Sequence, residues 1–276
     1  MVLCPWARAQ ELRLEEEADR LAQQLQKDQK KHFFPKVLVI DFPLRPGRVN
    51  ALGEFLADQF SNALAQESSP GAIVDRKRLR DYLRASGVSP SDLADRDIAL
   101  WIAGEVGANA IVAGSVSASQ KELILSIELI RIGDAKKLAS SKIEVPLNDH
   151  LSELLVRPLD WPAPPNVAVA CTSYSSRDEI SELFKALGVT QPTCIHCPPP
   201  QYTDDARRAR AQAGLKFDVV IDEQGHVAHI SVAEGDKYGL TAQAMREIQK
   251  WQFKPATKDG KPVTVCMLVE VSFRLF

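Results

Sequence analysis

The 276-residue chain lacks a long hydrophobic run and an excess of charge of either sign. No stretch approaches the roughly 18 uninterrupted apolar residues of a membrane-spanning helix, because Glu105 and Asn109 interrupt the most apolar region, residues 98–113. Its 34 Lys and Arg residues balance 36 Asp and Glu residues, so the sequence does not indicate the clustered basic surface that nucleic acid or anionic lipid requires. We therefore expect no nucleic-acid partner.

Motifs that carry catalysis are also missing. The sequence contains no phosphate-binding glycine loop, no Gly-x-Ser-x-Gly turn and no His-Glu-x-x-His zinc motif. Its five histidines are scattered, and the charged groups at Asp75-Arg76 and residues 95–97 are typical of solvated or capping positions at the ends of elements. We predict that the protein is not an enzyme and binds neither cofactor nor metal.

Cysteine is scarce, with five residues in the chain, and Cys194 and Cys197 form the one recognisable CxxC spacing. This pair supplies only two of the four ligands of a structural zinc, and no second pair lies at finger spacing, although Cys171 and nearby histidines are available. A thioredoxin-like redox motif would continue into a helix, whereas three prolines follow here. We predict a local disulfide between Cys194 and Cys197, as in an oxidising compartment, and expect Cys171 and Cys266 to be buried or unpaired thiols that take no part in a disulfide.

The residues that are present divide the chain into four segments. A composition of 45% apolar and 25% charged residues is that of a soluble globular protein, and the length allows two domains with separate cores. The fold class predicted is mixed α/β and α+β. In order, we predict an N-terminal helix, an α/β domain, a linker region with a short helix and a small C-terminal β-β-α-β domain: residues 10–32, 33–157, 158–197 and 198–276.

The N-terminal residues allow two interpretations. Ala7-Arg8-Ala9 before Gln10 resembles the end of a secretory signal whose charged and apolar parts lie upstream, or is a frayed terminus. Residues 10–31 are rich in helix formers, with apolar residues three or four positions apart, which predicts a helix with a thin apolar stripe.

Residues 33–157 alternate between strand and helix patterns. The predicted order is strand, helix, strand, helix, helix, strand, strand, strand, with the second strand at Ile73-Val74 and Asp92 as the cap of the third helix. Residues 37–42, 74–76 and 108–116, the last before a hairpin, resemble the amino-terminal domains of TolB-like, FlgO-like and CsgG-like bacterial envelope proteins. The resemblance implies an envelope location and contacts with other proteins, without catalysis.

The C-terminal patterns are regular. Phe217 to Val232 alternate around a Glu-Gln-Gly turn, which predicts a hairpin. Thr241 is expected to cap a helix whose inner face includes Trp251. Every odd position from Val263 to Leu275 is apolar, which predicts one long strand with a buried face.

Several motifs in this segment occur in the order found in the C-terminal domain of TonB-family energy transducers: Pro200-Gln201-Tyr202, Val219-Val220-Ile221-Asp222, Gly239-Leu240, Trp251-Gln252-Phe253-Lys254-Pro255-Ala256, Asp259-Gly260-Lys261-Pro262-Val263 and Val269-Glu270-Val271-Ser272-Phe273. The resemblance implies a periplasmic domain that docks on outer-membrane transporters. An extended receptor segment, the TonB box, would add to the last strand. The partner-binding residues so implied are Gln201, Tyr202, Val263, Thr264, Val265, Cys266, Met267, Leu268 and Val269.

Alternatives stay open at this point. For Gln201 and Tyr202 plain packing is an equal explanation, and self-pairing of an exposed strand would give a homodimer in place of receptor binding. A transducer normally also has a membrane helix, which meets an ExbB–ExbD motor, and a long proline-rich spacer. This sequence shows only short proline-rich stretches, so an envelope scaffold or assembly adaptor without energy transduction competes with the transducer. An ExbB–ExbD-type motor becomes a partner if an inner-membrane anchor lies upstream.

Overall fold

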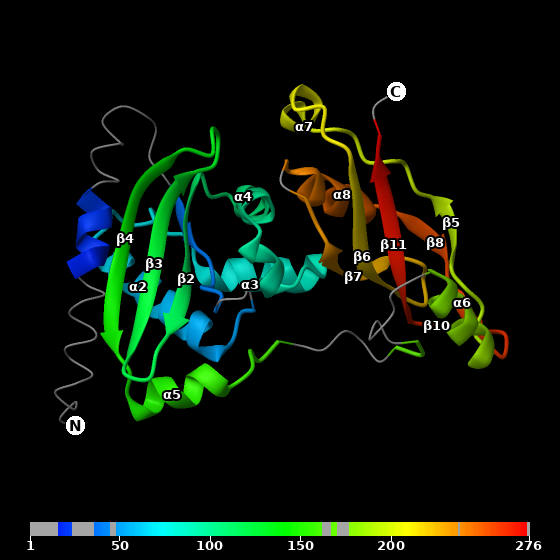
Figure 1. Ribbon diagram of the computed structural model, residues 1–276, viewed down its shortest axis with the longest axis horizontal. Coiled ribbons are helices and arrows are strands. Elements are labelled where there is room, and N and C mark those ends of the chain that lie inside the picture. The colour runs from blue at the N-terminus through cyan, green and yellow to red at the C-terminus, as the bar shows by residue number, and fades with distance from the viewer. Residues whose placement is uncertain are drawn as a thin grey trace. The chain divides into compact units, whose positions relative to one another are not determined.

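The computed structural model describes residues 16–23, 36–44, 48–161, 167–169, 177–236 and 238–274. Contacts divide the chain into two compact units, Met1–Tyr82 with Leu93–Trp161, and Leu83–Asp92 with Pro162–Phe276 (Figure 1). The fold is mixed α/β, as predicted, while the predicted domain boundaries stay predictions. Among the described residues, no helix is both long and apolar enough to cross a membrane.

The first unit is built on a four-stranded sheet in the order β1-β2-β3-β4 (Figure 1). β1 runs parallel to β2, whereas β2, β3 and β4 form antiparallel pairs. The strands are β1 (Val37–Val39), β2 (Ala110–Ala118), β3 (Glu122–Arg131) and β4 (Lys137–Pro146). The helices along this stretch are α2 (Ala51–Gln66), α3 (Arg76–Ser86), the 3-10 turn η1 (Pro90–Ala94), α4 (Arg96–Glu105) and α5 (Asp149–Val156), of which the end of α3 from Leu83 and the start of η1 up to Asp92 are counted with the second unit.

One face of this sheet carries the main core. α2, α5 and the described helical residues 16–23 pack their apolar side chains on alternate positions of the strands, for example Val112 and Leu125. Because successive strand residues point to opposite faces, Ile111 and Ile130 lie on the other face, where they line a hollow together with Ala99 of α4. The sheet therefore has helices on both faces.

Local side chains fix where the helices begin. The Asn50 carboxamide oxygen accepts a hydrogen bond from the Gly53 backbone N–H at 3.0 Å and caps α2. Asp95 caps α4 by accepting from the backbone N–H groups of residues 97 and 98, so the prediction of Asp92 as the cap is wrong. Asp92 lies instead inside η1, a turn that precedes α4.

Two further features of the first unit differ from the prediction. Ile73 forms only an isolated parallel bridge with Val37 and belongs to no strand, because the segment turns directly into α3. The pattern analysis did not identify α5, which follows β4 and is capped by Asn148. Its Leu151 and Leu154 complete the core under α2.

A buried ion cluster joins β1 to α2 and α3. The Arg76 guanidinium donates to the Val39 carbonyl at 2.7 Å, to the Asp58 carboxylate at 2.5 Å and to the Asp41 carboxylate. Only 4% of Arg76 and 5% of Asp41 is exposed to solvent. Burial by itself would lower the pKa of Arg76, but the charge of Asp41 and the hydrogen bonds to both carboxylates outweigh it and raise that pKa. Arg76 therefore stays charged and compensates the charge of the Asp41 carboxylate, which is almost wholly shielded from water.

The second unit contains a three-stranded antiparallel sheet in the order β11-β6-β7 (Figure 1). Its strands are β6 (Ala213–Ile221), β7 (Val227–Glu234) and β11 (Val265–Phe273), and the helix α8 (Leu240–Ile248) supplies buried apolar side chains. The β6–β7 hairpin confirms the predicted one. Short elements surround this sheet: α6 (Arg177–Ala186), β5 (Thr193–His196), α7 (Asp204–Arg208), β8 (Gln252–Lys254), β9 (Ala256–Lys258) and β10 (Lys261–Val263).

Three details of this unit correct the prediction. The last strand is interrupted at Thr264, because β10 pairs back on β9 in a hairpin while β11 pairs with β6. The residue that precedes α8 is Gly239, which has a left-handed backbone conformation and takes the N-cap position. Thr241 is therefore not the cap: its hydroxyl accepts a hydrogen bond from the Asp236 backbone N–H and donates one to the Asp236 carboxylate. Trp251 lies beyond the end of α8, where its indole N–H donates to a backbone carbonyl at Pro198.

Candidate functional site: the edge of the last strand

β11 is an edge strand. Among the described strands it pairs with β6 alone, in the order β11-β6-β7 and in unbroken antiparallel register from Val265 to Phe273. Backbone N–H and C=O groups of successive strand residues point alternately to the two sides of a strand. Half of the backbone groups of β11 therefore point away from β6.

The chain itself covers the beginning of this edge. The Thr264 carbonyl accepts from Ala168 N–H at 2.8 Å, and the Cys266 N–H donates to the Val169 carbonyl at 2.7 Å. Val169 thereby forms a short parallel bridge with Val265. These bonds also show which backbone groups point outward. The N–H of Cys266 points away from β6, and the backbone groups of every second residue after it do the same.

The rest of the edge is open in the described part of the chain. Leu268, Glu270 and Ser272 follow Cys266 at the same parity, and no backbone group of the described residues bonds to them on the side away from β6. We call the outward backbone groups of these three residues the β11 edge. In Figure 1 this edge is the side of the red strand opposite β6. Such a row of unpaired donors and acceptors is a template for one more strand.

The side chains of β11 hold the edge in place. Val269, Val271 and Phe273 are buried, and they lie opposite Phe217, Leu215 and Ala213 of β6. Glu270 and Ser272 are exposed. The backbone is therefore fixed by a packed core, so that an incoming strand meets donors and acceptors that are already in line.

The structure distributes the sequence-predicted binding residues over several environments. Val263 ends β10 opposite Ala256, while Thr264, Val265 and Cys266 lie where residues 168 and 169 cover the strand. Met267, Leu268 and Val269 continue along β11, of which Leu268 belongs to the open edge. The signal that sequence reasoning missed is the apolar run at residues 167–170, to which no role was assigned.

Tyr202 has a packing environment, and Gln201 beside it is exposed. The Tyr202 ring meets the ring of Phe273 edge to face, with centroids 5.2 Å apart, and its hydroxyl donates to the Ala211 carbonyl at 3.1 Å. Tyr202 therefore holds the segment before α7 against the end of β11. Of the two explanations left open for this tyrosine, the geometry favours packing.

The three cysteines in the described part of the chain are all disulfide-bonded. Cys194 and Cys197 form a disulfide at β5. Cys266 is also disulfide-bonded, so the expectation of an unpaired thiol at this position is wrong. Cys171 lies outside the described residues. Within the described ranges no group of three or more His, Cys, Asp or Glu side chains is placed to hold a metal ion.

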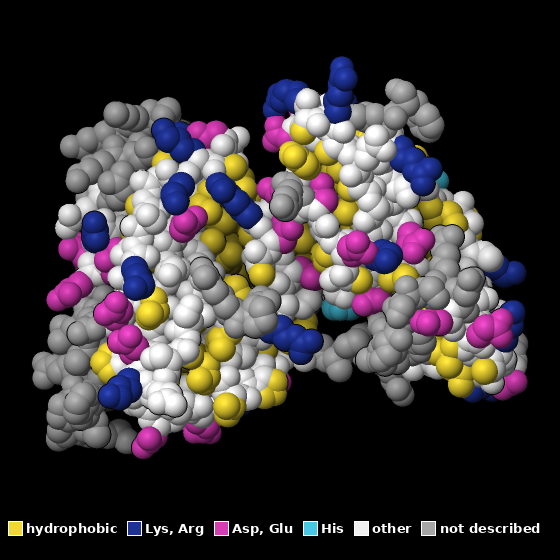
Figure 2. Space-filling model, in the orientation of Figure 1, with side chains coloured by type: hydrophobic (Ala, Val, Ile, Leu, Met, Phe, Trp, Pro, Cys, Tyr) yellow, Lys and Arg dark blue, Asp and Glu magenta, His cyan; other side chains and the backbone are white. Residues whose placement is uncertain are grey.

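Charges of both signs lie near the open strand. Burial raises the pKa of Asp218, which lies on β6 opposite Leu268. Lys216, opposite Glu270, pairs with Glu234 at 3.0 Å. On the face in Figure 2, the coloured Lys and Arg side chains are interspersed with Asp and Glu side chains. For the residues described, neither sign of charge dominates this face.

Comparison with known families matches both parts of the chain. The profile of the FlgO protein family matches residues 15–150, and the profile described as Gram-negative bacterial TonB protein C-terminal matches residues 198–275. The chain carries a TonB-type domain behind a FlgO-like domain. Both are families of envelope proteins without known catalysis, and the TonB-type domain is a protein-binding module. The open β11 edge lies within the residues matched to the TonB family.

Solved structures similar to this protein include the LpoB C-terminal domains of Salmonella enterica and Escherichia coli and the TonB C-terminal domain of Pseudomonas aeruginosa. The Salmonella domain is 25% identical and covers 47% of this chain and 98% of its own, with a TM-score of 0.35. The Escherichia coli domain is 20% identical and covers 48% of this chain and 97% of its own, with a TM-score of 0.36. The Pseudomonas domain is 20% identical and covers 31% of this chain and 88% of its own, with a TM-score of 0.28. No curated protein gave a significant match.

Proposed function

We propose that this protein docks on an envelope partner in the periplasm by accepting an extended segment of that partner as a strand on the β11 edge. The observation that supports this function is the row of outward N–H and C=O groups at Leu268, Glu270 and Ser272 on a strand whose other side is fully paired. The partner class favoured by the TonB-family match is an outer-membrane TonB-dependent transporter, which would make the docking part of energy-coupled transport. The proposed docking residues are Leu268 to Ser272, next to the chain's own residues 168 and 169.

The second candidate is an envelope scaffold or assembly adaptor that uses the same edge without energy transduction. The FlgO-like domain ahead of the TonB-type domain favours it, since the protein then presents two folded modules with separate cores. Coupling to an ExbB–ExbD-type motor is the property that separates the two candidates. An inner-membrane anchor belongs to the transducer alone.

The edge can be closed without harming the sheet. The N–H of Glu270 points away from β6, so Glu270→Pro removes an outward donor and adds a ring that blocks an incoming strand, while the β6–β11 hydrogen bonds remain. Glu270→Ala is the matched control, because it removes the same charge and keeps the N–H. Amide NMR spectra of both variants show whether the sheet is intact.

The experiment titrates the nitrogen-15-labelled full chain with a synthetic peptide that contains the TonB box of an outer-membrane transporter. We expect amide shifts that follow β11 from Leu268 to Ser272 in the wild type and in Glu270→Ala, and none in Glu270→Pro. Equal binding by Glu270→Pro would refute docking at this edge. Failure of the TonB-box peptide to bind any of the three proteins would refute the transporter as partner.

A second copy of the chain is the competing occupant of the edge. Light scattering coupled to size-exclusion chromatography measures this directly. A dimer of the wild type that Glu270→Pro converts to a monomer would assign the β11 edge to self-association, whereas identical masses for both proteins leave the edge to another partner.

A further inference from the structure

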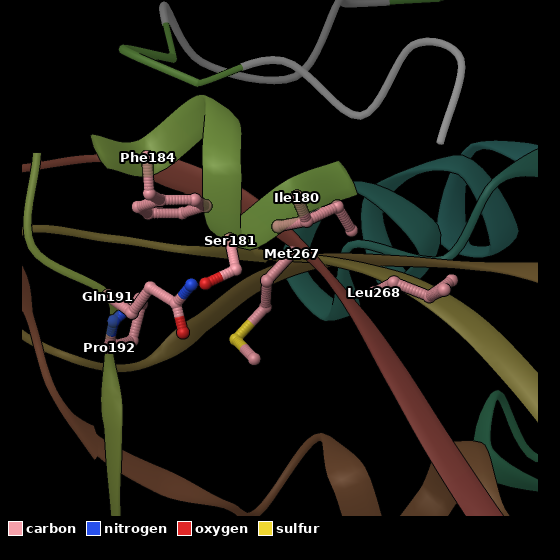
Figure 3. A pocket seen from close by; sticks show the side chains of 7 residues that line it. All are labelled: Ile180, Ser181, Phe184, Gln191, Pro192, Met267 and Leu268. Carbon is pink, nitrogen blue, oxygen red and sulfur yellow. The ribbon is translucent and has the colours of Figure 1, made fainter. Parts of the chain in front are cut away.

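A hollow lies beside the β11 edge, within the second unit. It is about 340 Å³ in volume. Figure 3 shows the side chains that line it, contributed by α6, by the segment before β5 and by β11. They are Ile180, Ser181, Phe184, Gln191, Pro192, Met267 and Leu268. We call this hollow the α6 pocket, and its wall formed by α6 and residues 191 and 192 lies outside the stretch matched to the TonB family.

The walls of the α6 pocket are held by packing and hydrogen bonds. Ile180 and Phe184 of α6 are buried in one apolar cluster with Leu268. The segment opposite α6 is fixed at Thr190, whose backbone N–H donates to the Thr257 carbonyl at 2.9 Å, while the two hydroxyls lie 3.0 Å apart. The pocket is therefore a preformed feature, with a volume at the lower end of the roughly 300–1,000 Å³ typical of ligand sites.

The pocket and the edge share Leu268. The side chain of Leu268 packs with α6, and its backbone belongs to the open edge. In a pair of strands, residues that lie opposite one another have their side chains on the same face. A strand added to the β11 edge would therefore direct the side chain opposite Leu268 toward α6, which is where the pocket lies.

We propose that the α6 pocket is a specificity site for one aliphatic or aromatic side chain of the added strand. This inference rests on the proposed function. None of the 7 lining residues carries a charge, so a charged side chain would lose its water there without gaining a counter-ion. Ser181 and Gln191 point toward one another across the pocket in Figure 3 and leave the apolar groups of Ile180, Phe184 and Met267 for the entering side chain.

The neighbouring backbone groups favour an extended peptide as the occupant. A lipid chain or a free apolar molecule would fill the pocket and leave the N–H and C=O groups of Leu268 and Glu270 without a backbone partner among the described residues. An added strand would satisfy these groups and at the same time place a side chain in the pocket. The partner is thus an extended segment with a large apolar residue opposite Leu268.

The experiment selects short random peptides on the full chain and measures the affinity of the enriched peptides. We expect the enriched peptides to share one aliphatic or aromatic position, and changing that residue of the peptide to Ala should weaken binding about 10- to 100-fold. Ser181→Trp fills the pocket and should weaken binding at least about tenfold. Glu182→Trp places the same ring at the next position of α6, where the side chain is 73% exposed, and should leave binding unchanged.

The outcomes separate the two proposals. Peptides that bind Glu270→Pro as tightly as the wild type, or a library without any binder, would overturn docking at the edge and the pocket with it. Peptides that need the edge but whose shared apolar residue can be changed to Ala with less than about a twofold loss of affinity would overturn the pocket alone, and Ser181→Trp should then also bind them within about twofold. The peptide substitution decides the matter even if Ser181→Trp fails to fold.

Discussion

Replacing Arg76 tests the buried ion cluster of the FlgO-like unit. Arg76→Met keeps the length and much of the apolar stem of the side chain but removes the positive charge beside Asp41, which is 5% exposed. The Val39 carbonyl loses its donor at the same time. The loss of the ion pair with Arg76 costs less at Asp58, because the Asp58 side chain is 38% exposed and water can solvate its carboxylate.

The expected cost follows from these exposures. Removing one partner of a buried ion pair typically costs about 3–5 kcal/mol, because the remaining charge is buried without compensation. A domain of this size has a total stability of about 5–15 kcal/mol, so Arg76→Met should remove a large part of it. The double variant Asp41→Leu with Arg76→Met should recover at least half of the loss, since both buried charges are then gone.

Lys77→Met is the matched control. Lys77 is the next residue of α3 and pairs with Asp81, but the two side chains are 73% and 53% exposed. Breaking such a pair changes stability by about 0–1 kcal/mol. Native-state hydrogen exchange of the β2 and β3 amides reports the free energy of unfolding for this unit alone. A loss below about 1 kcal/mol for Arg76→Met, or one equal to that of Lys77→Met, would refute the reasoning.

Three more predictions concern stability. Burial, reinforced by the charge of Asp41, raises the pKa of Glu54 above 4.5. The folded state therefore keeps the Glu54 proton to higher pH than the unfolded state does. As a result, the contribution of Glu54 to the free energy of unfolding falls as the pH rises from about 4.5 through the raised pKa. Glu54→Gln should gain stability over the wild type across this pH rise in urea unfolding, and a constant difference would contradict the shift. Gly225→Ala should lower the free energy of unfolding by more than about 2 kcal/mol, because φ is 85° and the new Cβ would lie 1.8 Å from the Phe253 carbonyl oxygen. Gly260→Ala is the control, since its φ is 76° but the new Cβ would meet no atom, and it should cost about 1 kcal/mol. Equal decreases in melting temperature for the two variants would exclude the clash at Gly225. Tyr202→Phe removes the hydrogen bond from the Tyr202 hydroxyl to the Ala211 carbonyl and should lower the free energy of unfolding in denaturant by about 0.5–1.5 kcal/mol without weakening peptide binding. A loss of peptide binding would instead assign Tyr202 to the interface.

The structure bears out sequence features that depend on near neighbours. The alternation around Phe217 and Val232 specified the β6–β7 hairpin, because this pattern repeats every two residues. The TonB-type domain was identified by the resemblance of its motifs to a known family. Cap positions were less certain: Asp92 and Asp95 are equally good capping residues, and only the backbone path shows that Asp95 is used.

Features that join distant segments could not be predicted by such patterns. Arg76 meets Asp41 across 35 positions of sequence, and Val169 meets Val265 across a much longer separation. The apolar series from Val263 onward is continuous in sequence, yet it divides at Thr264 because β9 and β6 compete as pairing partners. The sequence by itself determined the β6–β7 hairpin and, through the resemblance of its motifs to a known family, the type of C-terminal domain. Only the tertiary structure decided that β11 lies at an edge, that residues 168 and 169 cover its beginning and that α6 places a pocket beside it, since strand order depends on contacts that no local periodicity encodes.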